Sequence, residues 1–203
     1  MNSLFAQLIV LPTREKTLAV GIVALCAVIQ LRVYRRHRPV LSPEDSAQQL
    51  PSCAIIRPAI RFAKPFVSLL LVGSLCVGDP WMLIWHQSVL WRWIGVGMSV
   101  GGIVLFMWAM RSLGAAYRPC SAVVLPESIV THGPYRWLRH PIYLSNEIYM
   151  LGIGLATGSA WMALPLIVFG LVHLYQARRE ERQLAEGHPQ YRDYQRRTRW
   201  FGR

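Results

Sequence analysis

Apolar residues along this chain gather into long runs that are separated by polar and basic segments. Four long runs and one shorter run stand out, at about 17–33, 65–77, 93–110, 142–157 and from 161 onwards. A run of close to 20 mainly apolar residues is long enough for a helix to cross the hydrocarbon core of a bilayer. The pattern therefore predicts an all-α polytopic membrane protein with about five transmembrane helices.

Two of these predicted helices have unusual lengths. The run at 65–77 is short and ends at Asp79-Pro80, so its limits are the hardest to define. The last run continues as a helical pattern, and residues 161–186 would reach about 39 Å, beyond a hydrocarbon core of roughly 30 Å. The final turns of that helix are expected to project into water, and Gly187-His188-Pro189 is expected to stop it.

Basic residues alternate in density from one predicted loop to the next. The first loop, the third loop and the tail are rich in arginine, while the second loop carries only Arg92. Because cytoplasmic loops carry the excess of lysine and arginine, these three segments are expected to face the cytoplasm. Five spans then place the N-terminus outside and the C-terminus inside.

Small residues mark the predicted contacts between helices. Gly97 and Gly101 form one pair four residues apart, and Gly154 and Gly158 form another. Such pairs let two membrane helices approach closely. Gly158-Ser159 is a tight turn, so the last two helices are expected to form an antiparallel hairpin.

The composition agrees with a membrane protein and argues against a soluble domain, a nucleic-acid-binding protein and a metal site. Charged residues make up 16% of the chain, against about 25% in an average soluble domain. The net charge of +12 comes mostly from the edges of apolar runs, and no nucleic-acid-binding motif accompanies it. The four cysteines lack metal-ligand spacing, so no metal site is expected. We expect one membrane domain, 1–203, with three spans in 1–110 and the chemistry in 111–203.

One segment before the fourth predicted span concentrates aromatic and basic residues. It runs over residues 131–143 and reads THGPYRWLRHPIY. Pro141 suits the first turn of a helix, so His140 is expected at the helix start, beside free backbone N–H groups. A second segment, Glu180-Glu181, lies near the end of the last helix. The hairpin is expected to bring these two segments together on the cytoplasmic side.

Polar residues inside the apolar runs add to this region. Asn146 and Glu147 lie about one turn inside the fourth span, and His173 lies near the cytoplasmic end of the fifth. An ionisable side chain within a membrane is costly and marks a functional site by default. Arg136 and Arg139 are the candidate partners of Glu147.

The two segments resemble the core motifs of a known group of membrane enzymes. Residues 131–143 are similar to the first motif of the isoprenylcysteine carboxyl methyltransferases and to a related segment of the phospholipid methyltransferases. Glu180-Glu181, with the tyrosines that follow, is similar to the second motif. The resemblance covers roughly 113–200 and implies an S-adenosylmethionine-dependent methyltransferase embedded in the membrane.

The resemblance also implies contacts to the cofactor, which would be made by Tyr135, His140, Pro141, Tyr143, Glu180 and Glu181. Aromatic faces can stabilise a sulfonium cation, and an arginine such as Arg139 can orient an anionic acceptor. A carboxylate acceptor needs no general base, whereas an amine acceptor does, and Glu147 and His173 are the candidates. The predicted catalytic residues are therefore Arg139, Glu147 and His173. Carboxyl O-methylation of a lipidic or isoprenylcysteine-like acceptor is the favoured reaction.

The sequence leaves two other classes of protein function open. Sterol reductases resemble the same C-terminal fold and bind NADPH, although Glu180-Glu181 favours the methyltransferase. A non-enzymatic membrane protein, whose motifs serve topology and lipid contact, is the other class. For the methyltransferase, membrane lipids and a lipidic or prenylated acceptor are the expected partners. A bacterial inner membrane is the expected location, and the oligomeric state is left open.

Overall fold

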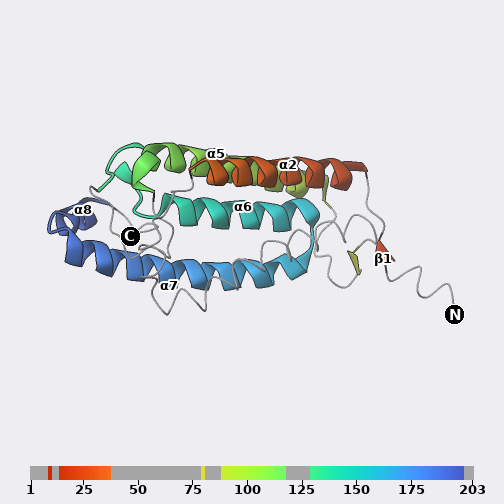
Figure 1. Cartoon of the computed structure of the whole chain (residues 1–203). Coiled ribbons are helices and arrows are strands. Elements are labelled where there is room, and N and C mark those ends of the chain that lie inside the picture. The colour runs from red at the N-terminus through yellow and green to blue at the C-terminus, as the bar shows by residue number, and fades with distance from the viewer. Residues whose placement is uncertain (1–8, 11–13, 38–78, 81–87, 118–128, 199–203) are drawn as a thin grey trace.

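The computed structural model describes residues 9–10, 14–37, 79–80, 88–117 and 129–198 of the 203-residue chain. Within these ranges, the main helices are α2 (Arg14–Arg36), α5 (Val89–Leu113), α6 (Pro141–Thr157), α7 (Ala163–Gly187) and the short α8 (Tyr191–Arg197). The four long helices lie lengthwise beside one another as a bundle, and α8 lies at one end of it (Figure 1). We call this the α8 end.

Short elements join these helices. The 3-10 helices are η2 (Gly114–Ala116), η3 (Gly133–Arg136) and η4 (Ala160–Met162). A two-residue antiparallel ladder pairs β1 (Ile9–Val10) with β2 (Asp79–Pro80). Apart from this ladder, the described residues confirm the all-α prediction.

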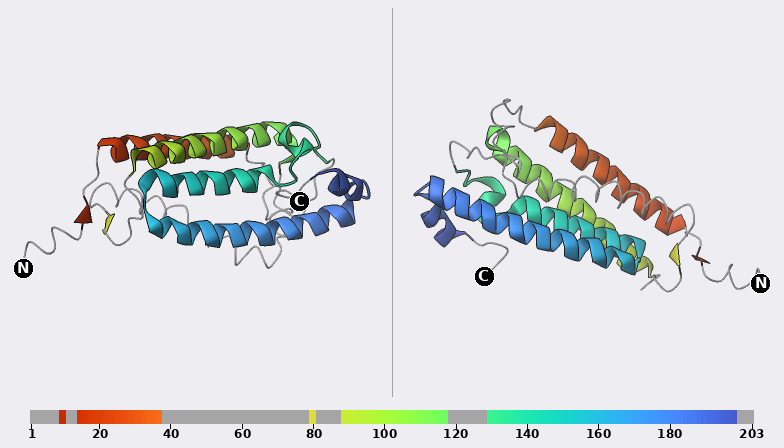
Figure 2. Two further views of the ribbon diagram at one scale, coloured as in Figure 1. Left: turned by 180° about the vertical axis from the view of Figure 1, so that it is seen from behind. Right: turned by 60° about the horizontal axis from the view of Figure 1, so that its bottom comes forward.

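The directions of the helices bring four chain segments to the α8 end. Helices α2 and α5 run toward that end, α6 runs away from it, and α7 returns (Figures 1 and 2). The start of α6 therefore lies beside the ends of α5 and α7. The predicted hairpin of the last two apolar runs is confirmed, with its turn at Gly158-Ser159.

Three described helices are long and apolar enough to cross a membrane, namely Arg14–Arg36, Val89–Leu113 and Ala160–Gly187. Helix α6 has only 17 residues, and about half of them are buried. The span predicted at 65–77 lies outside the described residues. Three of the five predicted spans are thus supported by length and composition, and α6 forms where the fourth was predicted.

Tryptophans on α5 mark two levels along the bundle. Trp91 and Trp93 are about half exposed near the start of the helix, and Trp108 is similarly exposed near its end. At 1.5 Å per residue, Trp93 and Trp108 are about 22 Å apart along the axis. Exposed tryptophan favours the headgroup level of a bilayer. This spacing suits a helix that crosses the hydrocarbon core between two aromatic belts.

Helices α5 and α6 approach most closely through glycines other than the predicted pairs. A Cβ on Gly102 would lie 2.9 Å from the Ser145 carbonyl oxygen, and Gly95 and Gly152 face each other's backbone. No described atom lies within 4 Å of a Cβ built on Gly97. The sequence correctly predicted close glycine packing on this helix but assigned it to the wrong face.

Gly101, Gly154 and Gly158 also do not make the helix contacts that were predicted for them. Gly101 also meets no described atom, while Gly154 faces the Met162 side chain instead of a neighbouring backbone. Gly158 has φ +70 and ends α6 in the left-handed conformation. Its role is therefore to close the helix, because that conformation favours glycine.

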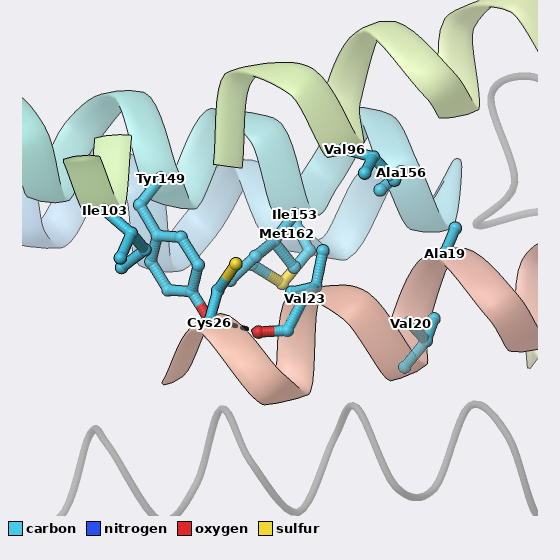
Figure 3. Close-up of a cluster of buried hydrophobic side chains, with 10 residues drawn as sticks. All are labelled: Ala19, Val20, Val23, Cys26, Val96, Ile103, Tyr149, Ile153, Ala156 and Met162. Carbon is cyan, nitrogen blue, oxygen red and sulfur yellow. Dashed lines mark hydrogen bonds between the residues drawn. The ribbon is translucent and has the colours of Figure 1, made fainter. Parts of the chain in front are cut away.

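The core between α2, α5 and α6 lies toward the end of the bundle away from α8. Figure 3 shows Val23 and Cys26 of α2 beside Tyr149 and Ile153 of α6. The Tyr149 hydroxyl donates a 3.0 Å hydrogen bond to the Val23 carbonyl, which satisfies the one polar group of this ring. This core fixes the position of α6 against α2 and α5.

Candidate functional site

A cluster of charged and aromatic side chains forms where the start of α6 meets the end of α7. Its members are Arg139, His140, Tyr143, Glu180 and Glu181, and we call it the carboxylate cluster. The first three precede or begin α6, and the two glutamates lie on α7. The predicted meeting of the two sequence segments is therefore confirmed.

Glu181 connects the helix start to α7. Its Oε1 atom lies 3.0 Å from Nη1 of Arg139 and 3.2 Å from Nε2 of His140. The Arg139 and Glu181 side chains are only 16% and 17% exposed. Because charge-assisted hydrogen bonds strengthen out of water, this carboxylate holds the segment before α6 against α7.

Glu180 makes the second link. Its Oε1 atom accepts a 2.5 Å hydrogen bond from the Tyr143 hydroxyl, and its Oε2 atom lies 3.7 Å from Nδ1 of His140. The Glu180 side chain is 32% exposed, about twice as much as that of Glu181. Glu180 is therefore the carboxylate of this cluster that a ligand can reach most easily.

Three rings stack in a row that leads from the carboxylate cluster into the bundle. His140 stacks on Tyr143 with centroids 5.5 Å apart, and Tyr143 stacks on His173 with centroids 4.8 Å apart. The interplanar angles are 16° and 18°, so the rings are close to parallel. This row joins α6 to α7 and gives the site an aromatic wall.

Glu147 and His173 form a pair beyond this row. The Glu147 Oε1 atom lies 2.6 Å from Nδ1 of His173, so the candidate partners Arg136 and Arg139 are not its partners. Neighbouring Asn146 instead accepts a 2.7 Å hydrogen bond from Gln30 of α2. The sequence-based expectation of an arginine partner for Glu147 was therefore wrong, because the histidine across the hairpin takes that place.

Helix α8 covers the segment before α6. The Tyr194 hydroxyl donates a 2.7 Å hydrogen bond to the backbone carbonyl of Tyr135, and the ring of Tyr191 is almost fully buried. Burial raises the pKa of Tyr194 to about 12, against the lowering effects of Thr198 and Arg139. Burial, with the charge of Glu180, also raises the pKa of Tyr135 well above its usual value. Both phenols stay protonated at neutral pH.

The turn that carries the first motif depends on Gly133, whose importance was not predicted. This residue has φ +62, and a Cβ there would overlap the Ser112 side chain at the end of α5. The turn also places Trp137 against Trp108, with ring centroids 5.8 Å apart. A glycine followed by proline before a helix was the available signal for such a turn.

The predicted cofactor residues differ in their accessibility. Tyr143, His140 and the two glutamates belong to the carboxylate cluster, whereas Pro141 is fully buried and serves to start α6. Tyr135 is 7% exposed, and its backbone carbonyl binds α8. Among the described residues, no group of three or more His, Cys, Asp or Glu side chains is arranged to hold a metal ion.

The fold and this cluster define a membrane-embedded helical protein with a polar site at one end of its bundle. A family model described as phospholipid methyltransferase matches residues 90–190, which include both motifs. The chain belongs to the phospholipid methyltransferase family. Its membership and its apolar helices together indicate an integral membrane methyltransferase, and they do not support the reductase alternative.

Individual relatives are also similar. The nickel-cobalt-cadmium resistance protein NccN of Alcaligenes xylosoxydans xylosoxydans is 38% identical over 162 residues, which are 78% of this chain and 70% of the relative. The cobalt-zinc-cadmium resistance protein CzcN of Cupriavidus metallidurans is 35% identical, over 53% of this chain and 51% of its own. Phosphatidylethanolamine N-methyltransferase B of Dictyostelium discoideum is 31% identical, over 52% of this chain and 54% of its own.

Proposed function

We propose that this protein transfers a methyl group from S-adenosylmethionine to a lipid acceptor at the α8 end of the bundle. The observation that carries the proposal is the carboxylate cluster, in which both family motifs meet through Glu181 and Glu180. A methyltransferase mainly has to align donor and acceptor and to exclude water. A rigid polar site at the end of apolar helices suits both tasks.

The donor set of the cluster fits the proposed cofactor. S-Adenosylmethionine supplies an electrophilic methyl group on a sulfonium, and it also carries an amino group and ribose hydroxyls. Glu180 and Glu181 offer carboxylate oxygens to such donors, and the faces of His140 and Tyr143 offer aromatic surface to a cation. Tyr135, through the turn it belongs to, and Pro141, through the helix start, would support these groups from behind.

An amine on a phospholipid is the acceptor that the family favours. The family is described by phospholipid methylation, and one relative is named as acting on phosphatidylethanolamine. Arg139, which was predicted to orient a carboxylate, has Nη1 paired with Glu181. The main reason to expect carboxylate recognition by this residue is thereby weakened.

Carboxyl O-methylation of an isoprenylcysteine-like lipid is the second candidate. One observation favours it, because Nε of Arg139 is buried and has no hydrogen-bond partner among the described residues. A donor in that condition is a site for an anionic oxygen. In this second reaction Arg139 would be the catalytic residue, and Glu147 and His173 would take no part in the chemistry.

Transfer of a radiolabelled methyl group tests both candidates. The purified protein would be incubated with methyl-labelled S-adenosylmethionine and vesicles containing either phosphatidylethanolamine or a prenylated cysteine. We expect alkali to leave the label non-volatile, because an N-methyl group is stable, whereas a methyl ester would release its methyl group as volatile methanol. Alkali-labile label would select the second candidate. Absence of label with both acceptors would overturn the proposal.

We also propose that the α8 end faces the cytoplasm of a bacterial inner membrane, where the cofactor is made. Arginines crowd this end of the bundle, at the ends of α2 and α5, before α6 and along α7 and α8. The positive-inside rule supports this orientation. Labelling of Arg197→Cys, in a background without the native cysteines, tests it. A membrane-impermeant reagent is expected to label this cysteine only after the cells are opened.

A further inference from the structure

The Glu147–His173 pair lies apart from the carboxylate cluster and bridges α6 to α7. The 2.6 Å contact joins two ionisable side chains that are 23% and 10% exposed. Both lie within helices that expose mainly apolar residues, such as Leu151, Leu171 and Tyr175. A site this apolar disfavours charge, so ionisable groups kept here call for an explanation.

A purely structural role would not need these residue types. The neighbouring Gln30–Asn146 hydrogen bond joins α2 to α6 with neutral amides alone. A well-packed apolar pair would hold two membrane helices together about as well as an ionisable pair. The acid and the imidazole therefore point to proton chemistry rather than to helix association.

The geometry of the pair assigns a different chemical role to each residue. Glu147 engages Nδ1 of His173, which orients the ring and fixes which nitrogen carries the proton. Among the described residues, Nε2 has no hydrogen-bond partner, so it is the nitrogen left for a substrate. This is the arrangement of a general base with an orienting carboxylate.

The pair also adjoins the place where the methyl donor would bind. Tyr143 stacks on His173 with one face, and its hydroxyl donates to Glu180 of the carboxylate cluster. The charged and titratable groups around the imidazole are therefore Glu147 and Tyr143 on α6, with Glu180 and His140 behind the tyrosine. The imidazole is therefore held between an orienting carboxylate and the ring that borders the carboxylate cluster.

We propose that Nε2 of His173 accepts the proton that the lipid amine must lose before methyl transfer, and that Glu147 is its positioning residue. This inference rests on the proposed function. At neutral pH the acceptor is an ammonium, whose nitrogen has no free electron pair. The proton passes to His173, the freed pair on nitrogen forms the N–C bond, and the S–C bond breaks with its electrons left on sulfur. The proton then leaves His173 for water.

The variant that tests this role is His173→Asn. The asparagine amide can still donate to Glu147 but cannot accept a proton at neutral pH. We expect methyl transfer to phosphatidylethanolamine to fall about 100-fold, within the range typical of a lost general base. S-Adenosylmethionine binding is expected to weaken far less than methyl transfer, because the carboxylate cluster keeps all of its side chains.

The pH profile separates catalysis from packing. In His173→Asn, the rate is expected to keep rising with pH toward the ionisation of the acceptor amine, since only neutral amine can react. In Glu147→Gln, the rate at neutral pH is expected to fall as well, because the imidazole loses the carboxylate that orients it. A purely structural role would lower the rate equally at every pH.

A measurement without cofactor or acceptor gives a second readout. In protein labelled with ¹⁵N-histidine, the Nδ1–H proton of His173 is expected at low field, because it is held by a carboxylate. It is expected to move upfield in Glu147→Gln and to disappear in His173→Asn. The control is Gln30→Leu with Asn146→Leu, which removes a nearby polar contact between helices and should leave the signal and the pH profile unchanged.

The outcomes distinguish this inference from the proposed function. If the wild-type protein transfers no methyl group, the proposed function fails and this inference fails with it. If the wild type transfers methyl to the amine and His173→Asn does so at the same rate across the pH range, only the inference fails. A pH-dependent loss confined to the His173 and Glu147 variants supports both.

Discussion

Replacing Glu181 by glutamine removes a charge from the centre of the carboxylate cluster while keeping the shape of the side chain. The Oε1 atom of Glu181 contacts both Nη1 of Arg139, at 3.0 Å, and Nε2 of His140, at 3.2 Å. The variant should therefore loosen the segment before α6, even though no atom is added and no cavity is left.

The magnitude follows from the two contacts. A hydrogen bond to a charged group contributes about 1.5–3 kcal/mol and a neutral one about 0.5–1.5 kcal/mol, so each contact should weaken by about 1 kcal/mol. Two contacts then sum to about 2 kcal/mol, or roughly a 30-fold rise in the local opening constant. Both side chains of the ion pair are less than one fifth exposed, which limits screening by solvent.

Hydrogen exchange read by mass spectrometry measures this opening. Peptides covering residues 133–143 are expected to exchange faster in Glu181→Gln, while peptides from the middle of α5 are not. Glu186→Gln is the matched control, because Glu186 is exposed on the same helix. Equal protection of 133–143 in both variants and the wild type would refute the role given to Glu181.

Three further predictions concern packing, the tail and pH. Gly102→Ala would put a Cβ 2.9 Å from backbone atoms of α6 and should destabilise the bundle by about 1–3 kcal/mol. The melting midpoint in detergent is expected to fall in this variant and to stay unchanged in the control Gly97→Ala. Tyr194→Phe removes the hydrogen bond to the Tyr135 carbonyl and should speed exchange in α8 by about fivefold, with Tyr175→Phe as the exposed control. The folded pKa of Tyr194 is about 12 against an ordinary 10, so its contribution to stability is present below pH 10 and is lost as pH rises toward 12. Unfolding followed against pH in the wild type and Tyr194→Phe checks this, and parallel curves would contradict it.

The site was the most predictable part of the molecule. Pro141 after His140 indicated a helix start, and the Gly158-Ser159 turn set the register of the hairpin. With the register set, Glu180 and Glu181 had to return to the level of that helix start. Local turn chemistry and helix rise were sufficient for this result, because neither depends on which helix face is buried.

The helix faces could not be predicted in the same way. Gly97 and Gly101 form as good a small-residue pair as Gly95 and Gly102, yet only the latter two meet α6. In a membrane the lipid-facing side of a helix is as apolar as the buried side, so periodicity carries little information about contacts. The pairing of Glu147 with His173 was missed for the same reason. The division of labour between 1–110 and 111–203 stays a prediction.

The most direct test of the account is a double-mutant cycle on the affinity for S-adenosylmethionine. Calorimetry would compare the wild type, His140→Ala, Glu181→Ala and the double variant, with Glu186→Ala as control. The account predicts saturable binding that weakens about tenfold or more in each single variant. It also predicts that the loss in the double variant falls short of the sum of the two single losses, because the contact between His140 and Glu181 couples the two side chains. Unchanged affinity in both single variants, or losses that add fully, would contradict the claim that the two motifs close one site.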